Sequence, residues 1–111
     1  VYMCNQNFYT IAQVGDTYKS IGKEMHVSER KLRKYNEVDK DYRLRAGDIV
    51  YFEKKQKQAD IHFKGVWHQI KDGESLYSIS QRYGMQLKTL VKINFIKDDY
   101  VLKVGNLLLI R

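Results

Sequence analysis

The sequence predicts an α+β protein built from two tandem βααβ modules, each a two-stranded antiparallel sheet with two helices on one face. Three observations carry this prediction. Residues 9–52 align without a gap to residues 67–110. Each copy begins and ends with a β-prone run, and two helical segments with capping residues lie between these runs. The boundaries that follow are an N-terminal extension at 1–8, module 1 at 9–53, a linker at 54–66 and module 2 at 67–111.

The repeat is specific because its identities fall on residues that shape turns and caps. Ten of the 44 aligned positions are identical at a shift of 58 residues. The most informative identical pairs are Gly15 with Gly73, Ser20 with Ser78, Asn36 with Asn94, Asp41-Tyr42 with Asp99-Tyr100, and Gly47 with Gly105. Chance similarity rarely places glycines, an asparagine and an Asp-Tyr pair in register together. We therefore expect two small modules, each with a core of limited size.

In module 1, the order of elements follows from turn signals and from apolar spacing. Asp16 or Thr17 can cap the first helix, because either side chain can accept a hydrogen bond from a free backbone N–H. Ser28 is a natural cap for the second helix, and Asn36 falls near the end of that helix. The predicted elements are a strand at 9–14, helices at 18–25 and 29–36, and a closing strand at 49–53.

Module 2 repeats this order. A turn and cap at 72–75 separate its first strand from its first helix, and Gly84 can end that helix in a left-handed conformation. In the linker, Ile61-His62-Phe63 alternates apolar and polar residues, which predicts an extended segment lying against a sheet. The predicted elements are a strand at 67–71, helices at 76–83 and 87–94, and a closing strand at 107–111.

Composition and charge exclude several classes of protein. Hydrophobic residues make up 43% of the chain and charged residues 30%, so a core can form. No apolar run approaches the roughly 20 residues of a membrane-spanning helix. The net charge of +7 is shared, since residues 9–55 and 67–111 each carry +3, which indicates an anionic partner but no single basic tail. No signal peptide is visible at the N-terminus. Because the chain begins with Val1 and not with Met, we expect it to be part of a longer protein.

Neither a metal site nor a catalytic site is predicted. Cys4 cannot form an internal disulfide, and its spacing from the three histidines matches no metal-ligand pattern. A glycosidase needs two carboxylates on either side of one cleft. The carboxylates at equivalent positions belong to separate modules: Asp16 with Glu74, and Asp41 with Asp99. No nucleophile is paired with a histidine. We expect no cofactor, and we expect the fragment not to be an enzyme.

The order of motifs resembles the LysM domain. In both modules a Gly-Asp-Thr-like turn opens a helix, a Ser-Ile pair follows, an Asn closes the second helix, and a late Gly precedes an apolar strand. Module 2 is the closer match, whereas module 1 departs at Tyr18-Lys19 and at His26, where the family often has Gly. The residues that carry the resemblance are Gly15-Asp16-Thr17, Ser20-Ile21, Asn36 and Gly47, and Gly73-Glu74-Ser75, Ser78-Ile79, Asn94 and Gly105.

This resemblance implies non-catalytic binding of glycans that contain N-acetylglucosamine, above all peptidoglycan and also chitin-type oligomers. Such modules anchor or target a larger cell-wall protein or hydrolase. That implies a monomer in the bacterial cell envelope, periplasmic or extracellular, with no membrane insertion and no specific nucleic-acid partner. The family's groove lies between the loop after the first strand and the loop after the second helix. Carried over by position, the glycan-binding residues are Gly15, Asp16, Thr17, Tyr18, Val38, Asp41, Tyr42 and Leu44, and Gly73, Glu74, Ser75, Leu76, Ile96, Asp99, Tyr100 and Leu102.

Several of these residues have a second interpretation. Tyr42 and Tyr100 can offer a ring face to a sugar, or they can pack their loops onto the core. Asp16 and Thr17 can act as helix caps alone. The two asparagines that close the second helices are expected to be structural and to bond loop backbone.

The alternative function is a basic helix-turn-helix-like module that binds nucleic acid. Two short helices joined by a tight turn span residues 20–36. The second of them carries four cations: Arg30, Lys31, Arg33 and Lys34. Against this alternative, module 2 has only Lys88 and Lys92 there, and no third helix completes a core. The basic face is more simply a solvated surface with some attraction for an anionic polymer.

Overall fold

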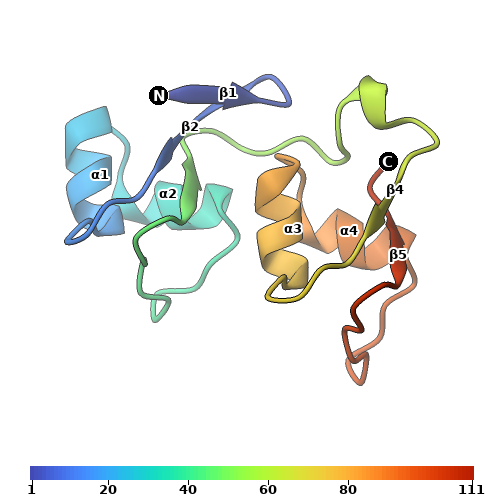
Figure 1. Ribbon diagram of the computed structural model, residues 1–111. Helices are drawn as coiled ribbons and strands as arrows, with labels where there is room; N and C mark the ends of the chain where they lie inside the picture. Colours follow the sequence, from blue (N-terminus) through green and yellow to red (C-terminus); the bar gives the residue numbers. More distant parts are fainter. The chain divides into compact units, whose positions relative to one another are not determined.

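The computed structural model describes all residues of the chain, Val1–Arg111, and divides into two compact units. Unit 1 covers Val1–Lys55 and contains module 1, and unit 2 covers Gln56–Arg111 and contains module 2. Each unit has two α-helices and a small antiparallel sheet (Figure 1), which confirms the predicted fold class. None of the helices has the length and apolar character needed to cross a membrane.

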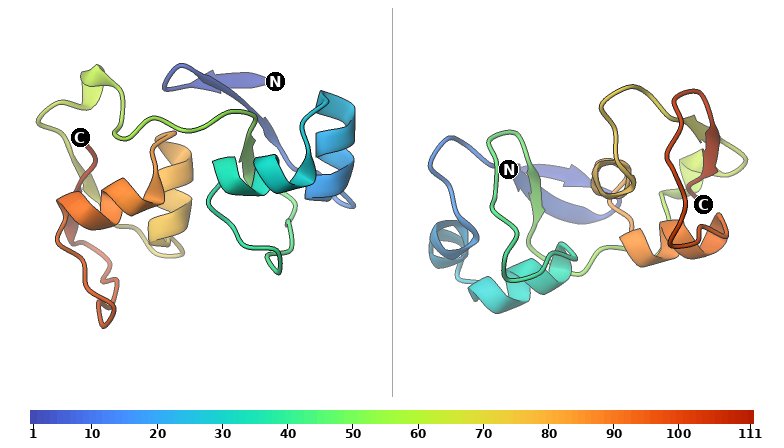
Figure 2. Two further views of the ribbon diagram at one scale, coloured as in Figure 1. Left: turned by 180° about the vertical axis from the view of Figure 1, so that it is seen from behind. Right: turned by 90° about the horizontal axis from the view of Figure 1, so that it is seen from below.

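Unit 1 combines a three-stranded sheet with two short helices (Figure 2). Its elements are β1 Tyr2–Cys4, β2 Asn7–Ile11, α1 Tyr18–Met25, α2 Glu29–Tyr35 and β3 Ile49–Tyr51. The strands lie in the order β1-β2-β3, and both pairs are antiparallel. Thr17 and Ser28 are the N-caps of the helices, and the side chain of each accepts a hydrogen bond from a backbone N–H.

Strand β1 lies in the stretch that the sequence predicts only as an extension. It is joined to β2 by a two-residue turn, Asn5-Gln6, with φ angles of 49° and 68°. Two successive positive φ angles are typical of the type I′ turn in tight hairpins. Tyr2 stacks on Tyr9 with ring centroids 5.3 Å apart. Strand β1 therefore adds an aromatic residue to the sheet face that lies away from the core.

Unit 2 repeats the arrangement with a two-stranded sheet. Its elements are a 3₁₀ helix η1 Ile61–Phe63, β4 Trp67–Gln69, α3 Leu76–Arg82, α4 Leu87–Ile93 and β5 Leu107–Leu109. Strands β4 and β5 pair antiparallel. At a shift of 58 residues, β2, α1, α2 and β3 fall on β4, α3, α4 and β5, so the gapless repeat of the sequence is also a repeat of structure.

The linker differs from its prediction at residues 61–63, which form η1 in place of an extended segment. The Asp60 side chain accepts a hydrogen bond from the backbone N–H of His62, and this cap favours a helical turn. Phe63 then meets the ring of Tyr83 edge-on, with centroids 5.1 Å apart. The backbone N–H of Ala59 donates to a carbonyl just after β5, so the end of the linker belongs to the fold of unit 2.

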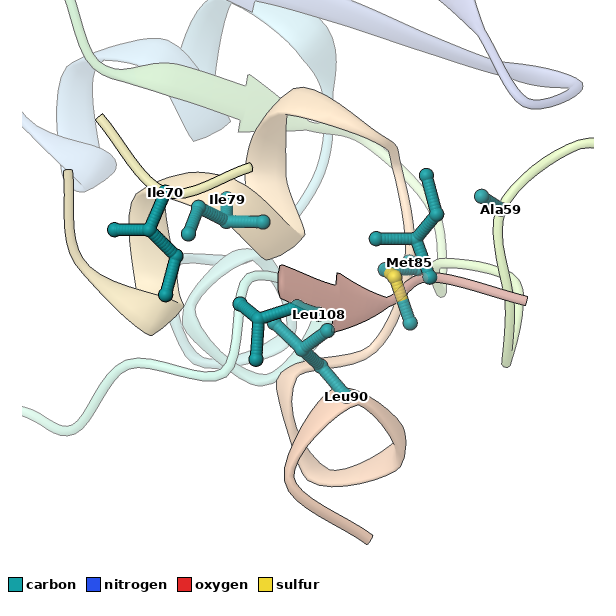
Figure 3. Close-up of a cluster of buried hydrophobic side chains, with 7 residues drawn as sticks. Ala59, Ile70, Ile79, Met85, Leu90 and Leu108 are labelled. Atoms are coloured by element: carbon teal, nitrogen blue, oxygen red, sulfur yellow. The ribbon is translucent and has the colours of Figure 1, made fainter. Parts of the chain in front are cut away.

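Each unit has a small hydrophobic core of its own, and Figure 3 shows the one in unit 2. Along β5, Leu108 is buried between the exposed Leu107 and the half-buried Leu109. This is the alternation of a strand with one covered face. The buried core residues are Ala12, Tyr18, Ile21, Leu32, Val50 and Phe52 in unit 1, and Ala59, Ile70, Ile79, Met85, Leu90, Leu108 and Ile110 in unit 2.

An asparagine joins the second helix to the closing strand in both modules. The Nδ2 of Asn36 donates to the carbonyls of Leu32 (2.8 Å) and Tyr51 (2.9 Å), and its Oδ1 accepts from the Tyr51 N–H (2.8 Å). Asn94 makes the equivalent bonds in module 2. The predicted structural role is confirmed, although the partners belong to helix and strand rather than to a loop.

Candidate functional site

The loop between β2 and α1 is a tight turn held by its own polar residues. Gly15 has a φ of +90°, which a glycine adopts without strain. The Asp16 carboxylate accepts from the N–H of Gln13 at 2.8 Å and closes the turn. Thr17 and Ser20 form a reciprocal capping box, in which each hydroxyl accepts the other residue's N–H at 2.9 Å. Of the two capping residues that the sequence allows, Thr17 caps the helix.

The loop after α2 is held chiefly by Arg33. Its Nη1 donates to the carbonyls of Asp39 and Tyr42, both at 2.8 Å. Its Nε pairs with Glu29 at 3.0 Å, and its guanidinium lies 4.7 Å from the centroid of the Tyr18 ring. The Asp39 carboxylate adds a hydrogen bond from the Tyr42 N–H. One side chain thereby ties this loop to α2 and to the first residue of α1.

These two loops border a hollow of about 580 Å³ in module 1. Tyr18 is buried, with 1% of its surface exposed, and the half-buried Tyr42 ring lies 6.3 Å from it. The Tyr42 hydroxyl donates to Asp48 at 2.7 Å. Burial and this hydrogen bond raise the pKa of Tyr42 above its ordinary value, so the phenol stays neutral. The residues that line the hollow are Thr17, Tyr18, Arg33, Lys40, Asp41, Tyr42, Arg43 and Leu44.

The structure brings together most of the site residues predicted for module 1. Those on the hollow are Thr17, Tyr18, Asp41, Tyr42 and Leu44. Gly15 and Asp16 lie in the adjoining turn and do not line it. Val38 borders a neighbouring hollow of about 610 Å³ along α2 and packs against the core.

In module 2 the corresponding turn is held by a partly buried polar network. The Oε1 of Glu74 accepts from the Lys71 N–H at 2.7 Å and lies 2.9 Å from Nε2 of His68. The other ring nitrogen of His68 lies 2.6 Å from the Tyr83 hydroxyl. Burial raises the pKa of the Glu74 carboxyl, but the hydrogen bonds from Lys71 and His68 and the charge of Arg82 outweigh it and hold the pKa below its ordinary value. Glu74 therefore serves the turn as a carboxylate.

The remaining residues predicted for module 2 are divided between core and surface. Three of them are half-buried and pack against the core: Leu76, Ile96 and Leu102. Ser75 caps α3, and Gly73 has a φ of +83° in the turn before it. Asp99 is exposed and Tyr100 is half-buried. Asp99 and Tyr100 are therefore the predicted residues whose polar side chains this loop leaves accessible to a ligand.

Four residues of these two sites are absent from the predicted glycan-binding set: Arg33, Lys40, Arg43 and His68. Three of them are cations on the hollow of module 1, and His68 orders the turn of module 2. The signal that could have found them is a difference between the two copies of the repeat rather than an identity. The basic face of the second helix is also not wholly the solvated surface that the sequence suggests, because the Arg33 side chain is bonded to the loop and to Glu29. No group of three or more His, Cys, Asp and Glu residues could hold a metal ion.

Known proteins resemble this chain at the level of both modules. A sequence model of the LysM domain matches residues 9–52 and 68–111. The chain is 29% identical over 107 residues to an autolysin of Enterococcus faecalis, an alignment that covers 87% of this chain and 14% of the autolysin. Among solved structures it is similar to the spore cortex-lytic enzyme SleL of Bacillus cereus, with 23% identity and a TM-score of 0.40 over 94% of this chain and 22% of that one. The SleL of Bacillus megaterium gives 18% identity and a TM-score of 0.38 over 92% of this chain and 22% of that one.

Proposed function

Because this chain belongs to the LysM domain family, we propose that it binds polysaccharides containing N-acetylglucosamine, peptidoglycan first and chitin-type oligomers second. LysM modules bind and do not catalyse, so these 111 residues form a binding unit and not an enzyme. The chain spans 14% of the length of the autolysin it matches. We propose that it anchors or targets a larger cell-wall protein in the cell envelope, as a monomer with one glycan site in each module.

The hollow of module 1 is the observation that carries this proposal. It is bordered by the loop after the first strand and the loop after the second helix, as expected of a groove in this family. Backbone N–H and C=O groups of such loops suit an acetamido group, and the Tyr42 ring offers an apolar face with a hydroxyl at its edge. The proposed site in module 1 is Gly15, Asp16, Thr17, Tyr18, Val38, Asp41, Tyr42 and Leu44, with the residues 58 positions later in module 2.

Amide chemical shifts followed during titration with soluble N-acetylglucosamine oligomers test this proposal. We expect the shifts to change at residues 15–18 and 38–44, and at residues 73–76 and 96–102. Asp41→Ala should weaken binding to module 1 about threefold, as expected for one lost exposed hydrogen bond. Glu53→Ala, which removes an exposed carboxylate outside the hollow, should leave binding unchanged. If no amide responds to any oligomer or peptidoglycan fragment at millimolar concentration, the proposal is wrong.

A further inference from the structure

The two proposed grooves carry different charges at positions that the repeat makes equivalent. The hollow of module 1 is lined by three cations: Arg33, Lys40 and Arg43. Module 2 has at these positions Val91, Asp98 and Val101. Both copies keep one further carboxylate, Asp41 or Asp99. At these four positions module 1 thus combines three cations with one carboxylate, whereas module 2 has two carboxylates. A further charged pair of this loop is reversed, with Asp39 in module 1 and Lys97 in module 2, so the groove of module 1 stays the more positive of the two.

The cations of module 1 are not equally available to a ligand. The Arg33 side chain is only 17% exposed and is bound to its own loop, so it contributes a fixed charge. Lys40 and Arg43 are exposed and make no hydrogen bond or ion pair within the chain. Lys40 also borders the neighbouring hollow along α2. Two cations without a partner in the chain therefore line the hollow together with Arg33, which the fold already holds in place.

Such a set of cations favours a particular ligand chemistry. Lysine and arginine side chains form charge-assisted hydrogen bonds with carboxylates, and these are stronger than bonds between neutral groups. Charges on one hollow lie within reach of the same ligand, since the screening length is about 8 Å at physiological ionic strength. In module 2, Asp98 and Asp99 would repel the same carboxylate and leave a neutral sugar unaffected.

The geometry points to different ligands for the two modules: module 1 selects amino-sugar glycan that carries carboxylates, and module 2 selects neutral runs of N-acetylglucosamine. This inference rests on the proposed function and adds the ligand class of each site. In a wall polymer the carboxylate has two sources, the lactyl group on the sugar ring and the peptide stem attached to it. The chemistry at the hollow of module 1 is the same for both.

Four soluble ligands separate these possibilities when amide shifts report on each module. They are a neutral N-acetylglucosamine tetramer, a disaccharide bearing a free lactyl carboxylate, the same disaccharide with its peptide stem, and that disaccharide peptide with every carboxylate amidated. We expect module 1 to bind the carboxylate-bearing forms about three- to tenfold more tightly than the amidated form, in line with two exposed ion pairs. Module 2 should show no such preference and should favour the tetramer. Tighter binding of the disaccharide with the free lactyl carboxylate would identify the lactyl group as the source. Tighter binding of only the disaccharide with its peptide stem would identify the peptide.

Exchanging the residues between modules provides the matched variants. Lys40→Asp combined with Arg43→Val gives module 1 the residues of module 2 at these two positions and should abolish its preference for carboxylates. Asp98→Lys combined with Val101→Arg should confer the preference on module 2. Lys19→Asp combined with Lys23→Val changes the charge equally at two residues of α1 that do not line the hollow, and should alter the preference of neither module.

The outcomes distinguish this inference from the proposed function. If neither module binds any of the four ligands, the proposed function fails and the inference fails with it. If both modules bind the ligands and show the same preference among the four, glycan binding stands and the inference is overturned. It is also overturned if polyglutamate, which has carboxylates but no sugar, shifts the module 1 amides as strongly as the disaccharide peptide. The inference is also overturned if the control substitutions on α1 lower the preference for carboxylates as much as Lys40→Asp with Arg43→Val does. That result would assign the preference to general charge attraction and not to the groove.

Discussion

In module 1 a side-chain network holds the loop after the second helix, whereas in module 2 such a network holds the turn after the first strand. In module 1, Arg33 holds the loop through two backbone carbonyls, while the turn relies on the short Asp16 side chain. In module 2, His68 and Glu74 brace the turn, while Val91 stands where Arg33 would hold the loop. The same backbone path is thus stabilised at opposite sides of the proposed groove.

This difference separates the residues that shape the fold from those that line the proposed groove. The identical residues of the repeat serve the backbone, as with Gly47 and Gly105 at φ angles of +94° and +92°. The asparagines and capping boxes are likewise shared. The groove-lining cations and the bracing networks are not shared. The residues that line the proposed groove can therefore differ between the modules while the fold stays the same.

The largest effect is expected at the shared asparagine. Asn36→Ala leaves the N–H and carbonyl of Tyr51 without their partner in a fully buried place, which should cost about 3 kcal/mol of the free energy of unfolding of module 1. Asn94→Ala should cost about 2 kcal/mol in module 2, because Asn94 is only half-buried. Amide hydrogen exchange measured separately in each module reports both values. A cost below about 1 kcal/mol for Asn36→Ala would contradict the structural role of this side chain.

The loop network of module 1 gives the next largest effect. Arg33→Val installs the residue of module 2 and removes two hydrogen bonds of a charged donor together with its contact to the Tyr18 ring. We expect a loss of about 2 kcal/mol and faster amide exchange at residues 39–44. Arg30→Val removes the same charge from an exposed site on α2 and serves as the control. Equal exchange rates in the two variants would show that charge, and not the loop contacts, stabilises this region.

The turn network of module 2 makes its stability depend on acid. The pKa of Glu74 is lowered in the folded state, so its carboxylate stabilises module 2 above the ordinary value of 4.5, and this contribution is lost as pH falls through the folded pKa. Glu74→Gln should cost about 1 kcal/mol at pH 7 and almost nothing near pH 3. Thermal unfolding of both proteins across this range measures the difference. A penalty that stays constant with pH would assign the effect to shape rather than to charge.

The helices and strands of both modules could be predicted because the repeat presents each signal twice. The sequence predicts a second helix of module 1 that follows a cap at Ser28 and ends near Asn36, and this helix forms as Glu29–Tyr35. Strand β1 escaped prediction, because its turn reads Asn5-Gln6 where the strongest hairpin signal has glycine second. The segment 61–63 alternates like a strand, yet a local cap from Asp60 makes it helical. In that segment the local contacts of the Asp60 side chain with His62 outweighed the periodicity.

The sequence could predict on which loops the site residues lie, but not which contacts their side chains make. Thr17 and Tyr42 could be placed on opposing loops from the family resemblance, and both line the hollow. The network of His68, Glu74 and Tyr83 could not be predicted, because it joins residues 6 and 15 positions apart through side-chain directions that no local pattern encodes. The burial of Tyr18, which leaves little of its ring to a ligand, depends in the same way on the packed core.

The smallest expected effect concerns the residue that ends the first helix of each module. His26 and Gly84 occupy equivalent positions and have φ angles of 60° and 62°, a left-handed conformation that costs a residue with a Cβ more than it costs glycine. His26→Gly should therefore stabilise module 1 by about 0.5–1 kcal/mol, since His26 is exposed and loses no packing. Gly84→Ala should destabilise module 2 by about 1 kcal/mol. Chemical denaturation with a probe in each module measures both. If His26→Gly instead lowers the stability of module 1, then the imidazole makes a stabilising contribution at the helix end that outweighs the backbone cost, and the two modules end this helix by different means.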